Sequence, residues 1–187
     1  VFARAHRAGA THAVVEILSE GTLQARHKYL ALNGLIVTNI QREHIERHGS
    51  FENYVAAKRK IVAELEHSPK RPRVLVVNGD NEFTKRFLDA IVEVKKTFPE
   101  GNLGSFNATN ARAATLIATE FGVAPDVAQR ALDAMPQIRG RTEPIDVGQP
   151  FKVIVDYAHT SDSLEALYAM FPSRKICVLG NTGGGRD

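Results

Sequence analysis

The chain has 187 residues, 43% of them hydrophobic and 24% charged, and its formal net charge is +3. These values are those of an ordinary globular protein, and the basic excess is too small and too scattered for a nucleic-acid surface. No apolar run approaches the roughly 20 residues that span a bilayer, so we expect neither a nucleic-acid nor a membrane partner. The single cysteine, Cys177, excludes an internal disulfide and favours a reducing, cytoplasmic setting.

The first half of the chain alternates between patterns typical of strands and of helices. Residues 11–17, 35–38 and 73–77 are short apolar runs, and each predicts a buried strand. Between the last two runs, residues 51–66 carry apolar side chains at helical spacing, and Ser50 is a suitable N-cap. This alternation favours an α/β fold with a mostly parallel sheet flanked by helices.

The second half predicts further helices and then a return to strands. A helix is expected over 82–90, followed by a turn-rich stretch without a strand up to Gly104. Gly148-Gln149 predicts a hairpin turn, and the last expected strand is a candidate for the start of a second domain. The remaining elements are expected as helices over 107–121, 126–135 and 163–171 and as strands over 143–147, 152–156 and 175–180.

Three polar residues lie near the expected strand ends, where a parallel sheet usually binds its ligand. Glu16 closes the first strand, His44 follows the second, and Lys58 lies in the next helix. A carboxylate and an imidazole can share a divalent cation, but an ammonium group beside them repels it. Carbamylation of Lys58 by carbon dioxide would replace the positive charge with an anionic oxygen ligand. These three residues alone do not justify that step.

The neighbours of these residues supply the justification. The run from Thr38 to Lys58, TNIQREHIERHGSFENYVAAK, resembles the central-domain signature of Mur ligases. Within the family it is most similar to the members that add the third amino acid to the peptidoglycan precursor peptide. The resemblance implies that Lys58 is a carbamylated lysine and that His44 is a magnesium ligand. Glu16 corresponds to the acidic residue of the family's first motif, which implies a catalytic metal site of Glu16, His44 and carbamylated Lys58.

Three downstream segments, 104–114, 140–143 and 156–160, are similar to family motifs that bind the nucleotide. The resemblance therefore implies a set of ATP-binding side chains drawn from all three segments. They are Asn107 and Asn110 at the adenine, Arg141 at the nucleotide, Asp156 at the ribose, and His159 as a weaker candidate in the same pocket.

The resemblance covers nearly the whole chain and implies both its organisation and its activity. Residues 1–148 correspond to the ATP-binding central domain, and residues 149–187 to the start of a Rossmann-like C-terminal ligase domain. The intact enzyme is expected to use ATP and Mg²⁺ to activate UDP-N-acetylmuramoyl-L-alanyl-D-glutamate through an acyl phosphate. It would then join this substrate to a free amino acid, which the sequence leaves open between diaminopimelate, lysine and others. We expect a monomer.

The chain departs from the family pattern in several places. Leu18 and Glu20 replace a serine and a histidine, Glu43 replaces an aspartate, and Ser161 replaces a proline. The stretch 78–104 is shorter than usual, and the phosphate-binding loop (G-x-x-G-K-[ST]) does not occur. Both ends of the sequence read as cut, and because the phosphate-binding loop is missing we expect this segment alone to be inactive.

Other interpretations remain open from the sequence. The chain could belong to a cyanophycin-synthetase-like or folylpolyglutamate-synthetase-like ligase of the same superfamily, or it could be a non-catalytic nucleotide-binding module. Asn107 could simply cap its helix, Asp156 could be a turn residue, and Gly183–Gly185 could be a hinge. His48-Gly49 is interpreted as a structural turn before the following helix.

Overall fold

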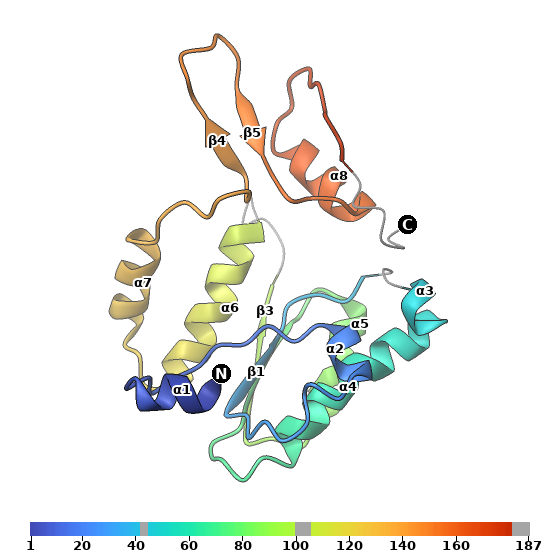
Figure 1. Ribbon diagram of the computed structural model, residues 1–187, viewed down its shortest axis with the longest axis vertical. Helices are drawn as coiled ribbons and strands as arrows, with labels where there is room; N and C mark the ends of the chain where they lie inside the picture. Colours follow the sequence, from blue (N-terminus) through green and yellow to red (C-terminus); the bar gives the residue numbers. More distant parts are fainter. Residues whose placement is uncertain (42–44, 100–105, 181–187) are drawn as a thin grey trace.

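A three-stranded parallel sheet lies at the centre of the first region of the molecule (Figure 1). The computed structural model describes residues 1–41, 45–99 and 106–180, without the side chains of Phe106, Asn107 and Asp162. The strands are β1 (Gly34–Val37), β2 (Val74–Asn78) and β3 (Val94–Phe98), in the order β1-β2-β3. Both pairs are parallel and all three strands start level, which confirms the α/β fold expected from the sequence.

Helices cover both faces of this sheet, with α4 (Phe51–Glu66) on one side and α6 (Phe106–Glu120) on the other (Figure 1). On one face α4 packs against Leu75 and Val77, and on the other α6 packs against Val74 and Val76. All four strand residues are fully buried, so β2 is the centre of both halves of the core. No helix in the described residues is both long and apolar enough to cross a membrane. The helices of this region are α1 (Phe2–Arg7), α2 (Ser19–Leu23), α3 (Ile45–His48), α4 (Phe51–Glu66), α5 (Glu82–Lys85), η1 (Arg86–Asp89), α6 (Phe106–Glu120) and α7 (Pro125–Asp133).

Helix α4 forms where its sequence pattern predicts. Ser50 Oγ accepts a hydrogen bond from the backbone N–H of Asn53 at 3.1 Å, which satisfies one of the free donors of the first turn. Val62 and Leu65 lie on the buried face and are fully shielded from solvent. Pro69 follows shortly after the helix and cannot continue it. Both the helix and its cap are thus confirmed.

A smaller region consists of an antiparallel hairpin and one helix. Strands β4 (Glu143–Ile145) and β5 (Val153–Val155) pair with Glu143 opposite Val155, which confirms the predicted hairpin. Helix α8 (Ser161–Ala169) follows, and its N-cap Thr160 forms a reciprocal capping box with Ser163. The domain boundary expected after residue 148 falls in the loop between the two strands.

Two of the predicted strands are wrong. Residues 11–18 and 175–180 contain no regular secondary structure, and Val14 and Val178 are almost fully exposed. An apolar run forms a strand only where a neighbouring strand satisfies its backbone hydrogen bonds. In the described part of the chain, β1 pairs only with β2 and β5 only with β4, so neither segment has found a partner.

Strand β3 was missed by the sequence analysis, which expected only turns in this stretch. Its centre contains Lys95 and Lys96, which are exposed, and only Phe98 is fully buried. Among the described strands β3 lies at the sheet's edge, where lysine side chains are well tolerated. The helix expected over 82–90 is also present in altered form, because it divides into α5 and the 3-10 turn η1.

Candidate functional site

The carboxyl ends of the three parallel strands meet at one edge of the sheet, and amide side chains join the loops that follow them. Asn78 Nδ2 donates to the carbonyl of Thr38 at 3.1 Å. Asn81 Nδ2 donates to Asn39 Oδ1 at 2.7 Å. The loops after β1 and β2 are therefore held together at the edge where parallel sheets bind their ligands.

The sequence analysis did not single out these amides, although a signal was present. A polar residue follows each apolar run directly, Thr38-Asn39 after β1 and Asn78 at the end of β2. Asn78 is 1% exposed, and its carbonyl accepts a hydrogen bond from the buried hydroxyl of Thr84. A buried polar group is kept only where it has a partner, so this network fixes the shape of the edge.

Lys58 lies on α4 and is half-buried. Its Nζ lies 5.2 Å from the centroid of the Tyr54 ring, one helical turn earlier, at a distance where a ring face attracts a cation. Tyr54 itself is 1% exposed and belongs to the core. The side chain of Lys58, the predicted site of carbamylation, therefore packs over a buried aromatic ring.

The rest of the predicted metal site is only partly described. Glu16 lies in the extended segment before α2 and is exposed, and His44 lies outside the described residues. Among the residues that the structure describes, no hydrogen bond or ion pair joins Glu16 to Lys58, and no group of three His, Cys, Asp or Glu side chains could hold a metal ion. The three-ligand set of Glu16, His44 and carbamylated Lys58 thus stays a prediction.

Two of the predicted nucleotide motifs meet at the base of the hairpin. Asp156, directly after β5, accepts hydrogen bonds at Oδ2 from the backbone N–H of Thr142 at 2.6 Å and from its hydroxyl at 3.1 Å. Its other oxygen, Oδ1, accepts from the N–H of Ala158 at 2.7 Å. Thr142 has a φ of 48°, a left-handed conformation that is costly for a branched residue. The carboxylate thus fixes a strained loop beside Arg141.

The same cluster brings together Arg141 and His159. The Arg141 guanidinium lies 4.9 Å from the centroid of the Tyr157 ring. The rings of Tyr157 and His159 meet edge to face with their centroids 5.1 Å apart, and His159 Nδ1 is hydrogen-bonded to the Tyr157 carbonyl at 2.9 Å. Three of the predicted nucleotide residues, Arg141, Asp156 and His159, therefore share one surface around Tyr157.

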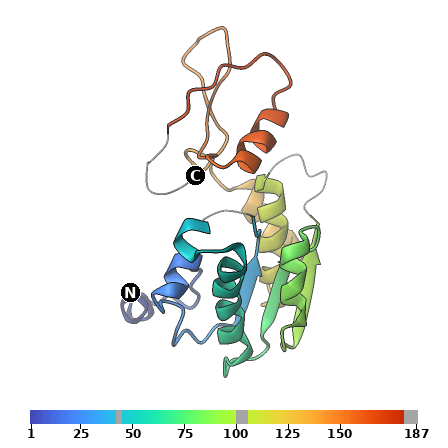
Figure 2. The same cartoon turned by 90° about the vertical axis from the view of Figure 1, so that its right-hand side faces the viewer.

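The two predicted adenine residues lie on the first turns of α6. Asn110 is exposed, and the side chain of Asn107 is among those that the structure does not describe. Residues three apart on a helix share a face, so both positions lie on one side of its first turns. In Figures 1 and 2 this end of α6 points toward the segment that leads into β4.

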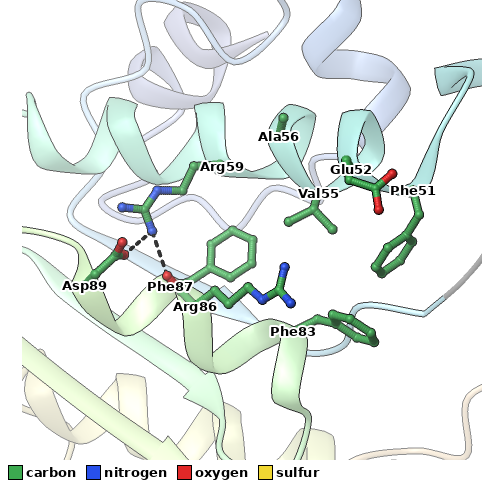
Figure 3. A pocket seen from close by; sticks show the side chains of 9 residues that line it. All are labelled: Phe51, Glu52, Val55, Ala56, Arg59, Phe83, Arg86, Phe87 and Asp89. Carbon is green, nitrogen blue, oxygen red and sulfur yellow. Dashed lines mark hydrogen bonds and ion pairs between the residues drawn. The ribbon is translucent and has the colours of Figure 1, made fainter.

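A cavity of about 450 Å³ lies on a different face of α4, between that helix and α5–η1 (Figure 3). The Arg59 side chain reaches from α4 to η1, where its Nη1 forms an ion pair with Asp89 and donates to the Arg86 carbonyl at 3.1 Å. Phe51 and Phe83 meet edge to face at 4.7 Å. The cavity contains none of the predicted site residues, and its lining consists of Phe51, Glu52, Val55, Ala56, Arg59, Phe83, Arg86, Phe87 and Asp89.

Comparison with known proteins decides the family. The profile of the Mur ligase middle domain matches residues 1–102, which is more than half of the 187 residues. The chain belongs to the Mur ligase family. This confirms the resemblance read from the motifs of the sequence.

Two curated relatives of this Mur ligase segment are 30% and 31% identical to it over the aligned positions. The UDP-N-acetylmuramoyl-L-alanyl-D-glutamate–2,6-diaminopimelate ligase of Solibacter usitatus is 30% identical over 223 positions, covering 100% of this chain and 45% of that protein. The UDP-N-acetylmuramyl-tripeptide synthetase of Roseiflexus sp. is 31% identical over 224 positions, covering 94% and 44%. The chain thus spans less than half the length of these relatives. The alignments are also longer than its 187 residues, so the relatives carry additional residues within the aligned region.

Solved structures share the fold. A UDP-N-acetylmuramoyl-L-alanyl-D-glutamate–2,6-diaminopimelate ligase superposes with a TM-score of 0.68 at 21% identity, covering 89% of this chain and 41% of that one. MurF from Acinetobacter baumannii gives 0.62 at 19% identity, covering 76% and 38%. At these identities the likeness concerns the fold alone. It shows that the sheet and its flanking helices are arranged as in these two solved structures.

Proposed function

We propose that this chain is the central part of an ATP-dependent ligase that adds the third amino acid to UDP-N-acetylmuramoyl-L-alanyl-D-glutamate. The observation that carries the proposal is the cluster of Arg141, Asp156 and His159, in which two separate nucleotide motifs meet around Tyr157. The names of the similar curated proteins, a diaminopimelate-adding ligase and a tripeptide synthetase, support the third-residue step. We further propose that residues 1–148 belong to the central domain and 149–187 to the start of the C-terminal domain.

The proposed reaction proceeds in two balanced steps. An oxygen of the substrate carboxylate attacks the γ-phosphorus of ATP, a P–O bond forms, the bond from the γ-phosphorus to the bridging oxygen breaks, and ADP leaves. The neutral amine of the incoming amino acid then attacks the acyl carbon and the C–N bond forms. The acyl C–O bond breaks, the nitrogen loses a proton, and inorganic phosphate leaves with the transferred oxygen. Such transfers depend mainly on positioning and on neutralising charge.

Nucleotide binding is assigned to side chains of α6 and of the hairpin base. Asn107 and Asn110 would contact the adenine, and Arg141 would reach the phosphates or sugar with a donor fork already stacked on Tyr157. Asp156 still has acceptor capacity for a ribose hydroxyl, because a carboxylate offers about four lone-pair sites and three are used here. His159 would border the same pocket.

The proposed magnesium ligands are Glu16, His44 and carbamylated Lys58. Carboxylate and carbamate oxygens are hard donors of the kind that Mg²⁺ prefers, and a bound Mg²⁺ would neutralise phosphate charge. Forming the carbamate requires a neutral Lys58 amine, which attacks carbon dioxide, forms an N–C bond and releases one proton. The Tyr54 ring below Nζ limits where the modified group can lie.

The test is a substrate panel with the longest natural protein that contains this segment. Phosphate release should require ATP, UDP-N-acetylmuramoyl-L-alanyl-D-glutamate and one free amino acid, tested with diaminopimelate and lysine. We expect this segment alone to show no ATP turnover, because it contains no phosphate-binding loop. Turnover with a tripeptide precursor and a dipeptide, but not with the dipeptide precursor, would instead assign a different step of the family to this protein.

A further inference from the structure

A buried polar contact joins two segments that are 29 residues apart in the sequence. Ser19 opens α2, three residues after Glu16, and His48 ends α3, just before the helix that carries Lys58. Ser19 Oγ and His48 Nε2 share a hydrogen bond of 3.1 Å, and the two residues are 4% and 7% exposed. Figure 2 shows α2 beside α3 and α4, in agreement with this contact.

His48 also contacts the helix on its other side. Its ring meets the Tyr54 ring edge to face, with the centroids 5.5 Å apart and the planes at 70°. The same Tyr54 ring lies below Lys58 Nζ. The His48 carbonyl accepts a hydrogen bond from Asn53 Nδ2 at 2.9 Å, which fixes the backbone of the turn. Ser19, His48, Tyr54 and Lys58 therefore form a continuous series of contacts.

A second contact between the same segments lies at the surface. Arg47 Nε lies 3.8 Å from Glu20 Oε1, with side chains that are 55% and 41% exposed. Glu20 occupies the position where the family pattern has a histidine, and here its charge faces an arginine. An exposed pair of this kind contributes little, whereas an unsatisfied buried group is costly. The Ser19–His48 bond is thus the stronger constraint on the segment that follows Glu16.

We propose that His48 is a positioning residue. Its imidazole ties Ser19, and with it the segment bearing Glu16, to the helix that bears Lys58, through Tyr54. The turn expected at His48-Gly49 is present, with Gly49 at a φ of 75°, and the proposal adds a role for the His48 side chain. The assignment of Glu16 and Lys58 to one metal site rests on the proposed function, but the contact between the two segments stands on the structure alone.

Amide hydrogen exchange of the 187-residue chain tests the contact directly. Replacing Ser19→Ala or His48→Asn should accelerate exchange in residues 16–23 about tenfold, the loss expected for one buried hydrogen bond. His48→Gln places a side-chain amide near the former Nε2 position and should restore most of the protection. His67→Gln is the matched control, because His67 directly follows α4, is exposed, and among the described residues its ring bonds only to the Ala63 carbonyl.

The double variant Ser19→Ala/His48→Asn separates a direct bond from general destabilisation. If the bond is what matters, the two substitutions together should accelerate exchange hardly more than either alone. Full additivity of the two effects, or unchanged exchange in residues 16–23 with either single variant, would overturn the proposal. Ser19→Ala removes only one oxygen, so it keeps the test informative even if a His48 variant fails to fold.

A spectroscopic test connects the contact to the proposed site. With ¹³C-bicarbonate and Mg²⁺, the wild-type chain should give a carbamate signal that Lys58→Arg abolishes. His48→Asn should weaken that signal, and His48→Gln should restore it. A missing signal in the wild type would contradict the proposed role of Lys58 and leave the exchange result to decide on His48. A full signal in His48→Asn beside altered exchange would reduce His48 to a purely structural residue and overturn the positioning role.

Discussion

The sheet region and the hairpin region are each stabilised by a different kind of interaction. In the sheet region Val74–Val77 are fully buried between α4 and α6, so apolar burial on both faces of β2 dominates. In the hairpin region no residue of β4 or β5 is fully buried, and Val147 and Phe151 are 85% and 65% exposed. There the shape depends on polar contacts at Asp156 and Thr160. The predicted nucleotide residues Arg141, Asp156 and His159 lie in this second region, so their geometry should respond to small polar changes.

The largest effect is expected from the core of the sheet region. Leu65→Ala removes a fully buried side chain from α4 and should lower the free energy of unfolding by about 2–5 kcal/mol. Leu167→Ala in α8 is the matched change in the hairpin region, where the leucine is only half-buried, and should lower it by about 1 kcal/mol or less. Urea denaturation of both variants measures the difference. Equal losses would contradict the contrast between the regions.

An intermediate and local effect is expected at the hairpin base. Asp156→Asn removes the negative charge that three donors share, and hydrogen bonds to charged groups contribute about 1.5–3 kcal/mol. Hydrogen exchange should accelerate at the amides of Thr142 and Ala158 while the β2 amides stay protected. Asp146→Asn serves as the control, because Asp146 is exposed and lies in the same hairpin, where its Oδ1 accepts from the Gly148 N–H. Acceleration that spread to β2 would mean that the two regions unfold together.

The smallest effect concerns an ion pair at the amino edge of the sheet, between the exposed carboxylate of Glu93 and the largely buried side chain of Arg73. Hydrogen bonds from Arg73 lower the pKa of Glu93 from 4.5 to about 2. Because the folded-state pKa is the lower one, Glu93 stabilises the protein above pH 4.5, and this contribution disappears as the pH falls through about 2. Glu93→Gln should therefore make the melting temperature depend less on pH between those two values. A variant with the same acid profile as the wild type would show that Glu93 does not contribute.

Much of the sheet region could be predicted because its signals are local. The periodicity of 51–66 and the cap at Ser50 gave α4, and the apolar run at 73–77 gave β2. The run at 11–17 also has an apolar centre, but it pairs with none of the strands that the structure describes, and a local pattern does not encode whether a partner strand is available. For β3 the prediction failed in the opposite way. Its lysines give no local strand pattern, but pairing with β2 makes the segment a strand.

The candidate site could be predicted only in part, for a related reason. The motifs singled out Arg141 and Asp156 as candidates for nucleotide binding, but the bond from Thr142 that joins those motifs depends on tertiary structure. The Ser19–His48 contact likewise spans 29 residues and leaves no periodic pattern. Amides such as Asn78 and Asn81 are common after strands, so their role at the sheet edge became clear only once the loops were seen together.

The central claim, an acyl-phosphate ligase acting on the dipeptide precursor, is tested most directly by oxygen transfer. The longest natural protein containing this segment would be given UDP-N-acetylmuramoyl-L-alanyl-D-glutamate labelled with ¹⁸O in its reacting carboxylate, together with ATP and the accepted amino acid. The account predicts that one ¹⁸O atom appears in the released phosphate for each amide bond formed. Amide formation with unlabelled phosphate would contradict it, because the carboxylate would then never have attacked the γ-phosphorus.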